Sequence, residues 1–348
     1  MKKKLIALLA IFAVIIIAGV GVTKLSKGKN EIASEDDLIV VTSFYPMYIL
    51  TANLAKDVPN VSVVNLTENQ TGCLHDYQLT TKDMIELNSA DLLVMNGGGM
   101  ESFIENVITT YPDLMVVRAT DGIELLPSTS EHSYEDETEE DHDHDHDAGE
   151  EDDHDHDHDA DVEENHDADI EDTHDHDHGD YNAHVWMNMD YYLVEMKNVY
   201  QALVAKDPEH RNLYEANYSE YKGKVEAVKE EFETELANLQ KKEIVIFHDA
   251  FAYLADEYGL EVIYTINLDD DTYLSAGEVK EIIDEVNLHG VEVLFTEEQY
   301  SDSIAESIAK ETNASVYIID SLVTGDLDLD SYLTGMENNL TVLKEALR

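Results

Sequence analysis

The stretch LIVVTSF (residues 38–44) is apolar through its first four positions, of which the last three are β-branched, and then turns polar. A short apolar run with this composition predicts a strand that is buried on both faces, as strands are in a parallel sheet. Further runs of this kind alternate with helical patterns: strands are expected at 61–67, 91–97 and 114–120, and helices near 47–57, 80–90 and 101–111. This alternation predicts an α/β lobe.

The same alternation returns in the last third of the chain. Strands are expected at 243–247, 260–266, 291–296 and 315–320. Between and after them we expect one helix that ends near 258, two helices near 276–289 and 302–312, and a C-terminal helix that begins at about 330. Between the two parts, residues 207–241 carry Pro208 at a position suited to a first helical turn and no further proline, which predicts one long helix. The fold class is therefore α/β, with two lobes, each a parallel sheet flanked by helices, joined by one long helix. Open α/β sheets bind ligands beyond the carboxyl ends of their strands, so we expect the site in the cleft between the lobes.

The N-terminus has the pattern of an export signal. Three lysines at positions 2–4 precede an uncharged apolar run at 5–22, and polar residues follow to 37. A cleaved signal and a retained anchor both fit an 18-residue run, and the anchor is the preferred interpretation. We therefore divide the chain into a signal or anchor with a tether (1–37), an N-terminal lobe (38–206), the linking helix (207–241) and a C-terminal lobe (242–348). The export signal predicts that the protein works outside the cytoplasm.

The charge of the chain excludes one class of partner. The formal net charge is −56, and 27 of the 77 acidic residues lie in the segment 128–180, which has no lysine or arginine. A surface of this sign repels the phosphates of nucleic acids, so we expect no nucleic-acid binding and look for cations instead.

The same acidic segment holds 11 of the 16 histidines. Its like charges and scarcity of apolar residues predict a disordered loop at 128–180. Neighbouring carboxylates favour protonated imidazole, so a metal ion must displace protons, and each site should bind weakly. We expect an accessory role in collecting metal for nine of these histidines: His142, His144, His146, His154, His156, His158, His174, His176 and His178.

Outside that segment, polar side chains follow the predicted strands. His248, Glu297 and Asp320 each come at the end of a strand of the second lobe, and His75 and His184 lie in turns of the first. If the lobes face each other, three imidazoles and one carboxylate converge, which is the ligand count of a tetrahedral zinc site. A site richer in oxygen would suit manganese better. Position alone leaves an ordinary hydrogen-bonding role open for each histidine.

Four motifs stand in order along the chain: GCLHDYQL (72–79), NAHVWMN (182–188), IVIFHDAF (244–251) and LFTEEQYSDSIAESIAKETNASVYIID (294–320). Together they resemble the metal-specific solute-binding proteins of bacterial ABC importers, in particular their zinc-uptake branch. The resemblance implies two α/β lobes bridged by a rigid helix with the metal between them, capture of Zn²⁺, delivery to an importer permease, and no catalysis. We expect a monomer.

The resemblance also suggests the ligands. The histidines of its motifs fall on His75, His184 and His248, and Asp320 best matches the acidic fourth position. Glu297 is the alternative fourth ligand, and a water or a loop histidine is a further one. Manganese-type relatives tend to place a glutamate where His248 stands, so zinc is preferred over manganese as the cargo.

The chain departs from the family pattern because it lacks the lipid-anchoring cysteine usual in Gram-positive relatives, which favours a peptide anchor or a released protein. Two other functions stay open. One is an extracellular metal buffer or adhesin with the same fold. The other is a zinc hydrolase with Glu297 as general base, although neither H-E-x-x-H nor G-x-S-x-G occurs in the sequence.

Overall fold

The computed structural model describes residues 37–67, 74, 77–128, 181–266, 274–297 and 302–348. His75 lies outside these residues, as do the apolar run at 5–22 and the nine accessory histidines. The expectations of a disordered loop and of an N-terminal anchor therefore fall outside the described residues.

The N-terminal lobe is built on a four-stranded parallel sheet. Its strands are β1 (Leu38–Thr42), β2 (Val61–Asn65), β3 (Leu92–Met95) and β4 (Met115–Arg118), in the order β2-β1-β3-β4. The helices of this lobe are α2 (Tyr45–Leu54), α3 (Thr81–Ser89) and α4 (Ser102–Ile108). Every residue of β3 is buried, which explains why its sequence is apolar throughout rather than alternating.

The C-terminal lobe repeats this design. Its parallel strands are β5 (Glu243–Ile246), β6 (Glu261–Thr265), β7 (Val293–Thr296) and β8 (Ser315–Ile318), in the order β6-β5-β7-β8. Its helices are α7 (Ala252–Tyr258), α8 (Ala276–His289), α9 (Asp302–Glu311) and α10 (Ser331–Ala346). The fold class expected from the sequence is confirmed.

Local sequence signals set several helix ends. Thr80 and Asp83 form a reciprocal capping box at the start of α3, and Ser275 and Glu278 form another at the start of α8. At the far end of α8, Gly290 takes a left-handed conformation with φ of 64°, which a residue with a side chain adopts only at a cost.

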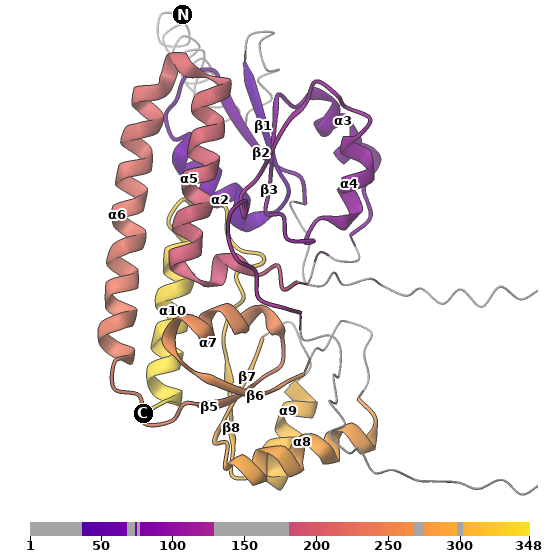
Figure 1. Cartoon of the computed structure of the whole chain (residues 1–348), viewed down its shortest axis with the longest axis vertical. Coiled ribbons are helices and arrows are strands. Elements are labelled where there is room, and N and C mark those ends of the chain that lie inside the picture. Colours follow the sequence, from indigo (N-terminus) through magenta and orange to yellow (C-terminus); the bar gives the residue numbers. More distant parts are fainter. Residues whose placement is uncertain (1–36, 68–73, 75–76, 129–180, 267–273, 298–301) are drawn as a thin grey trace, which may run out of the picture.

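Two helices connect the lobes along the sequence. Helix α5 (Met189–Lys206) leads through a 3₁₀ turn (Pro208–His210) into the 26-residue helix α6 (Arg211–Leu236). At 1.5 Å per residue α6 is about 39 Å long, and Figure 1 shows it running beside both lobes, with α5 next to its upper part and α10 next to its lower part. The long helix expected within 207–241 is therefore present.

One continuous cluster of buried side chains joins the lobes. It includes Val94 of β3, Tyr192 of α5, Phe232 of α6, Leu343 of α10 and Phe295 of β7. Each sheet also has one separate cluster of its own, around Leu93 in the N-terminal lobe and around Leu294 in the C-terminal lobe. Residues at or next to the carboxyl ends of four strands, β1, β3, β5 and β7, contribute to the core that the lobes share: Phe44, Val94, Ile246 and Phe295.

Candidate metal centre

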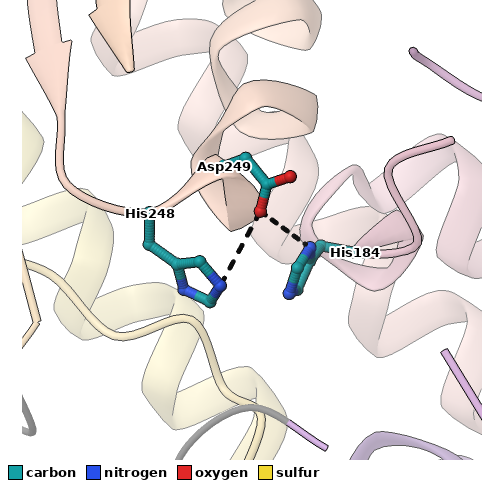
Figure 2. Close-up of side chains that lie close together, drawn as sticks. All are labelled: His184, His248 and Asp249. Atoms are coloured by element: carbon teal, nitrogen blue, oxygen red, sulfur yellow. Dashed lines mark ion pairs between the residues drawn. The ribbon is translucent and has the colours of Figure 1, made fainter. Parts of the chain in front are cut away.

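Three potential ligands converge between the lobes. Within the described part of the chain, the ligand atoms of His184, His248 and Asp249 all lie within 4.8 Å of one another (Figure 2). His184 comes from the N-terminal lobe, immediately before the 3₁₀ turn Val185–Met187. His248 and Asp249 follow β5 of the C-terminal lobe, where a second 3₁₀ turn (Asp249–Phe251) begins.

The Asp249 carboxylate lies between the two imidazoles. Its Oδ1 is 3.4 Å from Nδ1 of His184 and 3.7 Å from Nε2 of His248. The two rings stand edge to face with their centroids 4.6 Å apart. Two ligand atoms on one tetrahedral zinc ion lie roughly 3.3–3.6 Å apart, so the spacing between Asp249 and His248 is close to that of ligands sharing one ion.

Glu297 fixes the orientation of His248. Its Oε2 lies 2.5 Å from Nδ1 of His248, and its Oε1 accepts a hydrogen bond of 3.3 Å from the backbone N–H of Ser321. Because a carboxylate accepts, Nδ1 of His248 carries the hydrogen and Nε2 is left with the lone pair. A carboxylate behind a metal-binding histidine commonly does this.

A buried aromatic wall backs the centre. Trp186 is fully buried, and its ring centroid lies 5.2 Å from that of His184 and 5.1 Å from that of Phe44. Its Nε1–H donates to the carbonyl of Ser321 at 2.7 Å, and its own carbonyl accepts from the Tyr332 hydroxyl at 2.8 Å. The wall covers one side of the His184 imidazole and, through these two hydrogen bonds, joins the two lobes.

The predicted site residues have different positions. His184 and His248 are brought together and are buried, with exposed fractions of 2% and 5%. His75 lies outside the described residues. Glu297 is behind His248 rather than beside Asp249.

Asp320 is not part of the converging group. It is exposed, and its Oδ1 accepts a hydrogen bond of 2.8 Å from the backbone N–H of Leu322. It lines a cavity of about 440 Å³ together with Glu297. The fourth ligand therefore stays a prediction.

Asp249 was missed in the sequence analysis. The signal was present, because Asp249 directly follows His248 at the same strand end. Successive side chains of a strand point to opposite faces, so a strand that continued through both residues would place only one of them at the site. The 3₁₀ turn that begins at Asp249 removes that alternation and turns its carboxylate toward the histidines.

The geometry can be compared with known proteins. The model of the family "Zinc-uptake complex component A periplasmic" (ZnuA) matches residues 40–346. The chain belongs to this family. Membership agrees with the two lobes, the long helix and the histidines at the lobe boundary.

Similar sequences and structures include several ZnuA-family proteins. The chain is 29% identical to the high-affinity zinc uptake system protein ZnuA of Bacillus subtilis, with 100% of this chain and 99% of that protein covered. A manganese-bound mutant of a periplasmic metal-binding protein of Candidatus Liberibacter asiaticus is 25% identical, with a TM-score of 0.68 over 90% of this chain and 100% of the other. Zinc-bound AdcA of Streptococcus pneumoniae shares the fold at 22% identity and a TM-score of 0.67, over 89% of this chain and 58% of the other.

Proteins of the ZnuA family are periplasmic or extracytoplasmic components of zinc uptake. They are substrate-binding parts of a transport system rather than enzymes, and they work with an importer permease. Within the described residues, none of the helices is long and apolar enough to cross a membrane.

Proposed function

We propose that this chain captures Zn²⁺ between its two lobes, outside the cytoplasm, and delivers it to the permease of an ABC importer. One observation carries the proposal: two buried imidazoles from opposite lobes have their ring centroids 4.6 Å apart, with a carboxylate between them. Neutral imidazole is a favoured zinc ligand, and carboxylate oxygen offsets the charge of the ion. Relatives named for zinc binding support the same cargo.

The proposed ligand set is His75, His184, His248 and one carboxylate. We further propose that the protein is a monomer held at the membrane by residues 5–22, and that the histidine-rich segment supplies accessory weak sites. The assignments of His75, the anchor and the accessory sites rest on the sequence, because the residues concerned lie outside the described part of the chain.

A competition titration tests the function. The full chain is titrated with Zn²⁺ and Mn²⁺ against a chelator, beside His184→Ala and His248→Ala variants. We expect one tight zinc site in the parent, much weaker manganese binding, and a loss of at least about 100-fold in zinc affinity in each variant, because a tetrahedral site loses one of its four ligands. Equal affinity in parent and variants would refute the site. Tighter manganese binding would make manganese the cargo; a similar structure has been solved with manganese bound.

The carboxylate of the set is a separate question with its own test. We expect Asp249→Ala to lower zinc affinity by at least about 10-fold and more than Asp320→Ala, because Asp249 Oδ1 already lies 3.7 Å from Nε2 of His248. Both affinities are measured in the same competition titration. The reverse ranking would give the fourth position to Asp320.

A further inference from the structure

The two backbone segments on either side of residues 129–180 lie side by side. Pro127 and Tyr181 form an antiparallel bridge, and the N–H of Asn182 donates to the carbonyl of Leu126 at 2.8 Å. We call these four residues the neck. One hydroxyl of the opposite lobe holds both strands of the neck: that of Tyr253 accepts from the N–H of Leu126 at 3.0 Å and donates to the carbonyl of Asn182 at 2.7 Å.

The side chain of Asn182 points the other way, into the metal centre. It is 2% exposed. Its Oδ1 accepts from the backbone N–H of His184 at 2.9 Å, and its Nδ2 donates to the backbone carbonyl of Asp249 at 2.7 Å. A backbone N–H can only donate and a carbonyl can only accept, so these two contacts fix which end of the amide is oxygen.

The fixed amide decides the tautomer of His184. Nδ1 of this histidine lies 3.0 Å from Oδ1 of Asn182, an atom that can only accept. Nδ1 must therefore carry the hydrogen, and the neutral ring keeps its lone pair on Nε2. The Asp249 carboxylate beside the same Nδ1 favours the same tautomer. Figure 2 shows the other ring nitrogen of His184 turned away from Asp249.

We propose that Asn182 is a positioning residue of the metal centre, which presents Nε2 of His184 to the ion and couples the neck to the ligands of both lobes. The inference rests on the proposed function. The contacts above give Asn182 two links. Its side chain joins His184 to the strand end that carries His248 and Asp249, and its backbone carbonyl accepts a hydrogen bond from Tyr253. A change in the neck should then alter how the centre binds metal.

The test compares variants of the full chain by chelator competition with Zn²⁺ and by the visible absorption of bound Co²⁺, which reports the coordination geometry. Asn182→Ala removes the acceptor for His184, and we expect zinc affinity to fall about 10- to 100-fold with a changed Co²⁺ spectrum. Asn182→Asp keeps an acceptor facing both groups of His184 but loses the donor to the carbonyl of Asp249, so it should keep the parent Co²⁺ spectrum and recover only part of the affinity. Tyr253→Phe releases the neck and should lower the affinity by a smaller factor.

Asn53→Ala is the matched control. Asn53 is 5% exposed, and its Nδ2 donates to the carbonyls of Ile49 and Leu329 at 2.9 and 2.8 Å, away from the histidines. It should lose stability without losing zinc affinity. Parent affinity and spectrum in Asn182→Ala, while His184→Ala has lost binding, would overturn the positioning role alone. Parent affinity in His184→Ala would overturn the proposed function itself.

Discussion

Both oxygens of the Glu297 carboxylate accept hydrogen bonds, one from Nδ1 of His248 and the other from the backbone N–H of Ser321. The carbonyl of the same residue, Ser321, accepts from the indole of Trp186 in the other lobe. The orientation of His248 therefore depends on a short chain of hydrogen bonds that crosses the lobe boundary. A glutamate is required here because it can accept at both ends, whereas an amide can accept at only one.

We expect Glu297→Gln to weaken zinc binding by about 10- to 100-fold, the usual effect of losing a partner behind a metal-binding histidine. An amide nitrogen must face either Nδ1 of His248 or the N–H of Ser321, and both positions need an acceptor. Chelator competition measures the change. Glu257→Gln is the control, because Glu257 is half-buried and accepts a backbone N–H, that of Met189, away from the histidines. Equal affinity in both variants would remove Glu297 from the centre.

At the residue scale, the sequence predicts the histidines better than the acids. His248 could be named because it follows a strand, and His184 because it lies in the motif that follows the acidic segment; the structure places the two together. Three acids follow strands of the C-terminal lobe, however, and their roles depend on turns. Leu322 illustrates this: it takes a positive φ of 55°, rare for leucine, and its N–H then meets Oδ1 of Asp320. Nothing in the sequence near Asp320 indicates the positive φ of Leu322.

At the scale of elements, α5 carries an unusual buried acid. Glu195 is completely buried, and neither of its carboxylate oxygens has a hydrogen-bond partner among the described residues. Burial, reinforced by the nearby Glu101 carboxylate, raises the pKa of Glu195 well above its ordinary value of 4.5. The folded protein therefore keeps this proton at pH values where the unfolded chain has lost it.

This difference makes stability depend on pH. As the pH rises above 4.5, the unfolded chain releases the proton and the folded state does not, so the free energy of unfolding falls until the folded-state pKa is passed. We expect the stability of Glu195→Gln, which has no proton to lose, to gain on that of the parent as the pH rises from 4 to 8. Urea unfolding across this range measures it.

Glu231→Gln, at an exposed glutamate of α6, is the control for the loss of one acid from the chain. Its pH profile should follow that of the parent. A Glu195→Gln profile parallel to the parent at every pH would show that the buried carboxyl does not titrate between the two states in this way.

Element types were predictable here because buried parallel strands need continuous apolar runs, and such runs are visible in the sequence. Their ends were less so. The helix expected near 101–111 ends at Ile108. Thr109 and Thr110 then turn their hydroxyls back onto the carbonyls of Asn106 and Val107 at 2.7 Å. Such local hydrogen bonds compete with helix continuation, and apolar periodicity does not reveal them.

At the scale of the molecule, the shared core predicts how the protein unfolds. One buried cluster runs from β3 through α5, α6 and α10 to β7, so neither lobe can expose its inner face without disrupting the other. Trp186, the single tryptophan of the sequence, lies within that cluster. We expect its fluorescence and the far-ultraviolet circular dichroism to report one coincident transition in urea. Two separated transitions would show that the lobes unfold independently.

The same connections limit how far the lobes can move when zinc binds. Hydrogen bonds cross between them at several separate places: Tyr45 to Ser331 (2.7 Å), Trp186 to Ser321 (2.7 Å) and Met189 to Glu257 (2.9 Å). Wide opening would break all of these together and expose part of the common core. We therefore expect small-angle X-ray scattering of zinc-free and zinc-saturated protein to give radii of gyration that agree within about 1 Å, as for partners whose binding surfaces are already formed. A larger change in the radius of gyration would show that the lobes separate before they bind the ion. Saturating zinc should still raise the free energy of unfolding, by about 4 kcal/mol at a free concentration roughly 1,000-fold above Kd, because only the folded chain assembles the site.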